Sequence, residues 1–132
     1  MSIAAYKQTV RDTETSRQIE RRILSTVTGA MERDGAGYDT ATTAERIGIL
    51  SNGLRTAIAD NQRFWIAVRE DLADSANALS PDLRAQLISI SLWIDRQSTR
   101  VMGGEAGVTA LVEINHSIMR GLGGQQPRPS GV

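Results

Sequence analysis

The strongest helix signal in the chain is residues 80–104, which read SPDLRAQLISISLWIDRQSTRVMGG. The Ser80 hydroxyl can accept a hydrogen bond from a backbone amide of the first turn. Proline at the next position is tolerated because backbone amides in the first turn have no partner within the helix, so its missing amide proton costs nothing. The acid that follows is favourable near the positive end of the helix dipole. The pair Gly103–Gly104 predicts where the helix ends. Apolar residues recur at helical spacing on one face, with Trp93 beside it; this face comprises Leu83, Leu87, Ile90, Ile94 and Val101.

The residues after this helix predict one more helix and then a tail. Helical spacing continues from about residue 108 to 120, with one side formed by Val108, Leu111, Ile114 or Asn115, Ile118 and Leu122. Residues 121–132 contain four glycines and two prolines and too little apolar surface to offset the entropy of ordering. We therefore expect a domain over residues 1–122 and a disordered tail over residues 123–132.

A long helix is predicted before residue 80, over residues 42–74. Thr42 and Glu45 have the spacing of a capping box at its start. Gly48 and Gly53 weaken its first half, or let another backbone approach closely. Its expected packing seam, at intervals of three and four residues, comprises Ile47, Ser51, Leu54, Ile58, Asn61, Trp65, Val68 and Leu72.

The first helix is predicted over residues 4–33 and ends at the glycine-containing segment 34–37. Eight successive polar residues, 11–18, offer no apolar face, so we expect a break or an exposed segment there. The predicted apolar stripe of this helix comprises Tyr6, Val10, Ile19, Ile23, Val27 and Met31. The whole pattern predicts an all-α protein, a small bundle of about four helices.

Composition limits the classes of function. A chain of 132 residues with 40% hydrophobic positions has room for one domain. It has 15 basic and 15 acidic residues and no cysteine, so no charge excess points to nucleic acid or an anionic membrane, and thiolate metal sites are excluded. The first 20 residues do not resemble a signal peptide, and no apolar run could span a bilayer. We expect a soluble, cytoplasmic protein.

Motifs for catalysis or metal binding are weak. His116 has no recognisable nucleophile or metal partner, and the acids Glu70, Asp71 and Asp74 supply too few oxygen ligands for a calcium or magnesium site. The glycine-rich segment 103–107 lacks the lysine of a phosphate-binding loop and is interpreted as a turn. We therefore expect neither an enzyme nor a bound cofactor or metal.

The few aromatic residues are the most informative side chains. Phe64 and Trp65 are adjacent and project about 100° apart on a helix, so one buried stripe has difficulty covering both. One of them is expected to be exposed or to contact a partner, because exposed apolar patches mark interaction sites. The alternative is that both tryptophans, Trp65 and Trp93, belong to the core.

Several blocks of residues follow one another in a specific order and spacing between Phe64 and Leu122. They are Phe64-Trp65, Glu70-Asp71-Leu72-Ala73, Asn77-Ala78-Leu79-Ser80-Pro81, Leu83-Arg84-Ala85, Leu87-Ile88-Ser89-Ile90-Ser91-Leu92-Trp93-Ile94, Leu111-Val112-Glu113-Ile114-Asn115 and Ile118-Met119-Arg120-Gly121-Leu122. By these blocks the stretch resembles the flagellar biosynthesis regulator FlaF family of alphaproteobacteria, and the resemblance covers about 60 residues well. Residues 11–63 match more loosely.

The resemblance implies a small helical cytoplasmic protein that promotes flagellin production and export, opposite or alongside the flagellin translation repressor FlbT. Family members look like flagellin-binding factors and export chaperones. A competing hypothesis is post-transcriptional control, through FlbT or flagellin messenger RNA. The arginines at positions 17, 21 and 22 are the only plausible RNA contacts, and the balanced charge argues against direct RNA binding. The protein is expected to be a monomer or a homodimer.

The binding hypothesis is helix-in-groove recognition, in which an amphipathic segment of unassembled flagellin lies in an apolar groove of the bundle. The residues expected to form this groove or the core beneath it are Phe64, Trp65, Leu72, Ile90, Trp93, Ile94 and Ile118. The residues expected at its polar rim are Glu70, Asp71 and Asn115.

Overall fold

The computed structural model describes the backbone of residues 3–122, with the side chains of Ile3 and of residues 18–121. Within these residues the structure is helical and has no strand, which confirms the all-α bundle. The elements are α1 (Ile3–Asp34), α2 (Thr43–Ile49), the π-helical segment η1 (Leu50–Leu54), α3 (Arg55–Ala73), α4 (Pro81–Met102) and α5 (Val108–Leu122). The disordered tail predicted over residues 123–132 lies outside the described residues.

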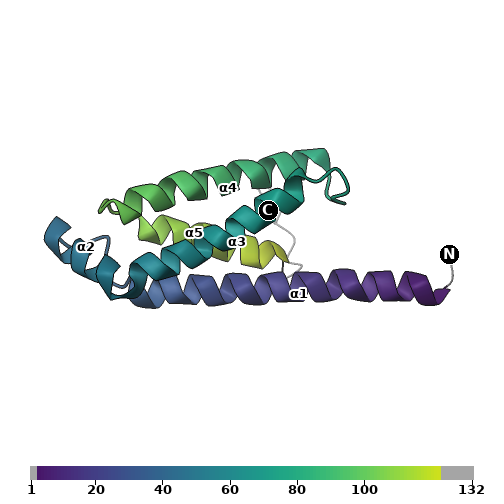
Figure 1. Cartoon of the computed structure of the whole chain (residues 1–132), viewed down its shortest axis with the longest axis horizontal. Helices are drawn as coiled ribbons and strands as arrows, with labels where there is room; N and C mark the ends of the chain where they lie inside the picture. Colours follow the sequence, from purple (N-terminus) through teal and green to yellow (C-terminus); the bar gives the residue numbers. More distant parts are fainter. Residues whose placement is uncertain (1–2, 123–132) are drawn as a thin grey trace, which may run out of the picture.

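The long helices run back and forth along one direction (Figure 1). α3 packs against both α1 and α4, and α5 packs mainly against α1. α4 and α5 contact each other over a shorter stretch, although they follow one another in the chain. The N-terminal half of α1 extends past the ends of the other helices in Figure 1.

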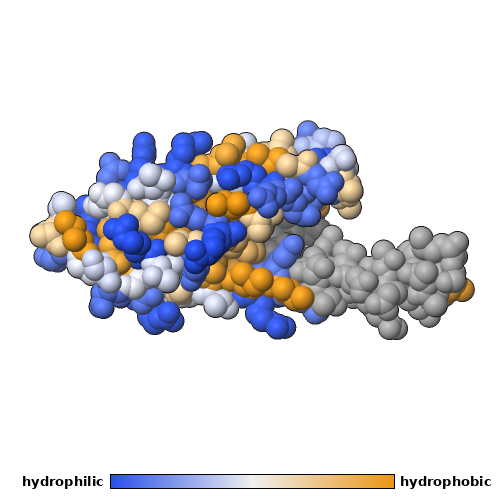
Figure 2. All heavy atoms as spheres, viewed as in Figure 1, coloured by the Kyte–Doolittle hydropathy of each residue, from blue (hydrophilic) through white to orange (hydrophobic). Residues whose placement is uncertain are grey.

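α1 differs from its sequence-based prediction in two ways. The backbone is helical through residues 11–18, so the predicted break does not occur. The buried stripe is also shifted: Ile19 and Ile23 are 47% and 44% exposed, whereas Leu24 is fully buried beside Val27. On the face drawn in Figure 2, orange apolar side chains gather along this part of α1. The reason is that α3 and α5 together cover the side of α1 that carries Leu24, not the side that carries the two isoleucines.

The helix predicted over residues 42–74 is interrupted near its start. Thr42 caps α2 as expected, because its hydroxyl oxygen accepts a hydrogen bond from the Glu45 amide at 3.2 Å. Gly53, at φ +122°, then turns the chain out of helical geometry. The kink changes which side chains face inward, so Leu50 is buried while Ile47 is 60% exposed. The predicted seam is therefore correct from residue 54 onward and wrong at Ile47 and Ser51.

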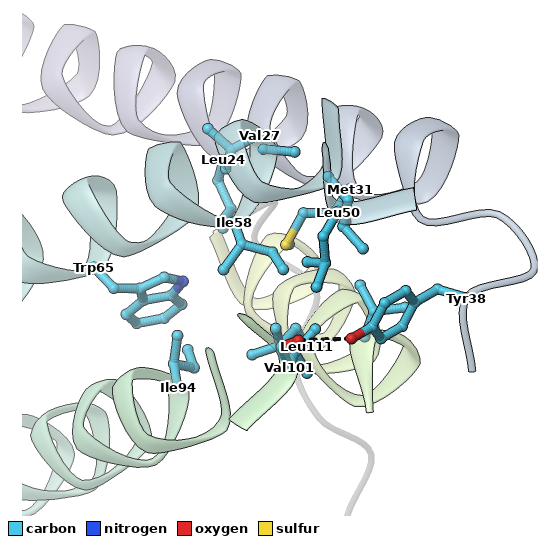
Figure 3. Packing of buried hydrophobic residues seen from close by; sticks show 13 residues of the cluster. Leu24, Val27, Met31, Tyr38, Leu50, Ile58, Trp65, Ile94, Val101 and Leu111 are labelled. Atoms are coloured by element: carbon cyan, nitrogen blue, oxygen red, sulfur yellow. Dashed lines mark hydrogen bonds between the residues drawn. The ribbon is translucent and has the colours of Figure 1, made fainter. Parts of the chain in front are cut away.

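The ends of α4 are as predicted. The Ser80 hydroxyl oxygen accepts a hydrogen bond from the Leu83 amide at 3.3 Å, and Gly103 caps the last turn. Leu83, predicted on the buried face, is exposed instead because it lies in the first turn, at the edge of the bundle. The core that all the long helices share is drawn in Figure 3; its labelled members are Leu24, Val27, Met31, Tyr38, Leu50, Ile58, Trp65, Ile94, Val101 and Leu111.

Candidate functional site

A concave surface lies between α4 and α5. It arises because α4 packs chiefly on α3 and α5 chiefly on α1, so the two helices separate from each other. The groove has a volume of about 540 Å³ and is open to solvent. Its lining residues are Ser89, Ile90 and Trp93 from α4 and Ala110, Glu113, Ile114 and Ser117 from α5.

The groove has an apolar floor and a polar rim. Ile90, Trp93 and Ile114 are half-buried and pack against the core, so their inner atoms are held in place while their outer atoms face the groove. Ser89, Ser117 and Glu113 are exposed and supply hydrogen-bonding groups around that floor. An aromatic and aliphatic floor with a few polar groups at its edge suits the apolar face of a peptide helix.

Trp65 and Asn115 lie in the core and not at this surface. Trp65 is 2% exposed, and its indole Nε1 donates a hydrogen bond to Asn115 Oδ1 at 3.0 Å. Asn115 Nδ2 donates to Asn61 Oδ1 at 2.8 Å and to Thr28 Oγ1 at 3.0 Å. Asn115 is 0% exposed, so its placement at a polar rim was wrong. The asparagine is buried because two other helices, α1 and α3, provide it with hydrogen-bond partners.

The other predicted site residues are divided between core and surface. Leu72 and Ile94 are buried, and Ile118 is half-buried against the core. Phe64 is half-buried, with its ring edge-to-face with Trp65 at a centroid distance of 5.7 Å. Of the predicted set, only Ile90 and Trp93 line the groove. Phe64, Glu70 and Asp71 lie on α3, away from it; Glu70 and Asp71 are exposed there. A role of these residues in binding a partner stays a prediction.

Sequence reasoning missed the α5 side of the groove. Its residues are Ala110, Glu113, Ile114 and Ser117, at intervals of three and four positions. This spacing marks one helix face and was visible in the sequence. The spacing of the groove face was not recognised because this face lies directly beside the core face of α5, which carries Leu111 and Asn115.

Residues 2–122 match the family model described as flagellar protein FlaF. The chain belongs to the FlaF family. It is therefore a flagellar protein, and the matched residues include all the helices described here. No curated protein and no solved structure matches the chain.

In this FlaF chain, the end of the bundle near the α4–α5 loop is joined by polar contacts. The Asp39 carboxylate accepts hydrogen bonds from the amides of Gly107, Val108 and Thr109 at 2.7–3.0 Å, and so caps α5 from a distant part of the sequence. Burial by itself would raise the pKa of Asp39, but these amide hydrogen bonds outweigh it and the pKa is lowered. The carboxylate is thus held in its charged form.

Two neighbours of Asp39 complete these contacts. The Tyr38 hydroxyl donates a hydrogen bond to the Val101 carbonyl oxygen at 2.6 Å (Figure 3). Burial raises the pKa of the Tyr38 hydroxyl, which stays neutral and able to donate. The Arg46 guanidinium donates to the carbonyl oxygens of Tyr38, Asp39 and Gly104 at 3.2–3.3 Å. Together these three side chains attach the α1–α2 connection to the α4–α5 loop.

The candidate catalytic and metal-binding residues have local structural roles. His116 Nε2 lies 2.7 Å from Glu32 Oε1, which links α5 to α1 at the surface. Asp71 and Asp74 accept hydrogen bonds within the turn after α3, from the Asn77 side chain and the Ala76 amide. Among the residues that the structure describes, no three His, Asp or Glu side chains converge as a metal site.

None of the helices within residues 3–122 combines the length and the apolar character that a bilayer crossing requires.

Proposed function

We propose that this FlaF-family protein binds flagellin in the cytoplasm and promotes its synthesis and export by acting as a flagellin chaperone. The observation that carries the proposal is the apolar groove between α4 and α5, with Trp93 and Ile90 on one side and Ile114 on the other. Family membership connects the groove to the flagellum. The segment bound is an amphipathic helix of unassembled flagellin, which presents an apolar face at helical spacing.

The physical basis is the burial of apolar surface on both partners. The half-buried ring of Trp93 and the adjacent isoleucines keep part of their surface in water when the groove is empty. Covering them removes that surface from water, which contributes about 25 cal/mol for each Å² of apolar area. The flagellin face is protected at the same time, so flagellin remains monomeric until it is exported.

The decisive experiment is calorimetric titration of monomeric flagellin into the full-length protein at two salt concentrations. We expect binding that changes little with salt, because the groove floor is apolar and carries one charged residue, Glu113, at its rim. Trp93→Ala is expected to weaken binding by about tenfold or more, as for a central aromatic side chain of an interface. Circular dichroism is the measurement that checks whether the variant is folded.

A matched control is available on the same helix. Leu92 is next to Trp93, is 44% exposed and does not line the groove, so Leu92→Ala removes exposed apolar surface outside the site. It is expected to bind flagellin as the wild type does. If both variants bind flagellin normally, the groove is not the site.

Parallel titrations with FlbT and with flagellin leader RNA test control of translation. The exposed Arg21 and Arg22 on α1 are the described cations on which an RNA contact would depend. Such a contact would weaken steeply as salt increases, because each neutralised phosphate releases counterions. Binding of FlbT or RNA without binding of flagellin would replace the chaperone proposal with translational regulation.

A further inference from the structure

The rim of the groove carries a carboxylate that the rest of the described structure leaves available. Glu113 is exposed, lines the groove opposite Trp93, and makes no ion pair with any side chain that the structure describes. A carboxylate beside a half-buried aromatic ring at the edge of a groove favours a ligand with a cation next to a flat apolar group.

The chain itself contains a segment of that chemistry. Residues 123–132 read GGQQPRPSGV, and Arg128, the only charged side chain among them, stands between Pro127 and Pro129. We propose that residues 127–129 dock in the α4–α5 groove of the same molecule, with the prolines against Trp93 and Arg128 paired with Glu113. The tail then competes with flagellin for the groove; this regulatory part rests on the proposed function, whereas the docking does not.

The length of the connection fits this docking. Glu113 lies nine residues before Leu122, where α5 ends, which is roughly 13 Å along a helix. Residues 125–128 follow the two glycines at positions 123 and 124, and four extended residues span roughly 13 Å. Gly123 and Gly124 stand at the point where the chain must reverse, and glycine adopts the required backbone angles without a steric penalty. The segment after the two glycines is therefore long enough for Arg128 to reach the level of Glu113.

The energetics favour a contact that opens easily. Proline-rich segments are already extended in solution, so docking on an aromatic groove orders few additional torsions. The ion pair lies at the surface, where it contributes little and is weakened by salt. Such a tail covers the groove until a partner with a larger apolar face displaces it.

The test uses ¹H–¹⁵N spectra of the full-length protein, which contains two indole N–H groups. Trp93 lines the groove, whereas Trp65 is buried and donates to Asn115, so the Trp65 signal is an internal reference. Arg128→Glu is expected to shift the Trp93 indole signal and leave the Trp65 signal in place. Arg63→Glu makes the same charge change on α3, outside the groove, and is expected to shift neither signal.

Charge exchange makes the test specific. Glu113→Arg combined with Arg128→Glu is expected to return the Trp93 signal toward its wild-type position, and removal of residues 123–132 to shift it furthest. An unchanged Trp93 signal after removal of the tail would overturn the proposal. A shift that depends on protein concentration would also overturn it, because the tail would then occupy the groove of a second copy.

Flagellin titration separates the two proposals. If the tail covers the groove in about nine-tenths of the molecules, its removal raises the apparent affinity for flagellin about tenfold. Equal affinity with and without the tail would overturn the competition. If flagellin binds neither chain while the Trp93 shift is present, the proposed function fails and the docking stands.

Discussion

The two ends of the α4–α5 hairpin use their polar side chains in opposite ways. Near the loop, Asp39 and Arg46 direct their charged groups at backbone amides and carbonyls of the same chain. Along the groove, Glu113 is exposed and forms no ion pair with the described residues, beside the half-buried Trp93. Polar groups satisfied within the chain stabilise the fold, whereas those left at an apolar surface are available to a ligand.

The largest expected effect separates the two tryptophans. Trp65→Ala is expected to lower the free energy of unfolding by about 3–5 kcal/mol, because it leaves a core cavity and removes the hydrogen bond to Asn115. Trp93→Ala should cost less than about 2 kcal/mol, since its ring already contacts water. Urea unfolding followed by circular dichroism measures both. Equal losses would mean that the groove is part of the core.

The second largest loss of stability is expected near the α4–α5 loop, at Asp39. Asp39→Ala removes the acceptor of the Gly107 amide and of the first two α5 amides, and is expected to destabilise the protein by about 2 kcal/mol. If this variant unfolded at the same urea concentration as the wild type, Asp39 would not stabilise the loop end of the bundle.

The same carboxylate predicts a pH dependence. Because the pKa of Asp39 is lowered in the folded protein, its contribution is complete above the unfolded value of about 3.9 and is lost as the pH falls through the folded value. Wild-type stability should therefore fall below about pH 4. Asp39→Asn, which cannot titrate, is expected to show a weaker fall in that range in acid-unfolding curves.

A smaller effect is expected at the neighbouring tyrosine. Tyr38→Phe keeps the buried ring and removes the hydrogen bond to the Val101 carbonyl, at a cost of about 1 kcal/mol. Hydrogen exchange of the amides in the α4–α5 loop should become faster in this variant. If the amide hydrogens of α4 along the groove exchanged faster and those of the loop did not, the loop end and the groove would not be separate structural units.

The smallest effect on stability is expected in the groove. Glu113→Gln should change the free energy of unfolding by no more than about 0.5 kcal/mol, because the side chain is exposed and has no ion pair in the described structure. Thermal unfolding at neutral pH measures this. A loss comparable with that of Asp39→Ala would show that Glu113 is a structural residue.

The sequence predicted most accurately the features that depend on neighbouring residues. The start of α4 at Ser80 and its end at Gly103 follow from capping chemistry within a single turn, and both were predicted. The helical class follows in the same way from apolar spacing. The kink at Gly53 was not predicted, although the glycine was noted, because its φ of +122° depends on the packing of α2 and η1 around it.

The candidate site was harder to predict because burial depends on several helices at once. On α5, helical spacing left Ile114 and Asn115 as alternatives for the inner face, and hydrophobicity alone favours the isoleucine. The structure buries Asn115 because Trp65, Asn61 and Thr28 supply hydrogen-bond partners from two other helices. Ile114 is consequently left at the groove.

By itself, the sequence determined the helical class, the limits of α4 and α5, and a FlaF resemblance that the family match over residues 2–122 confirms. These depend on hydrogen bonds and spacings within a few residues. Only the tertiary structure decided that Trp65 is core and Trp93 faces a groove. The physical reason is that α4 packs chiefly on α3 and α5 on α1, so the space between α4 and α5 depends on helices distant in the sequence.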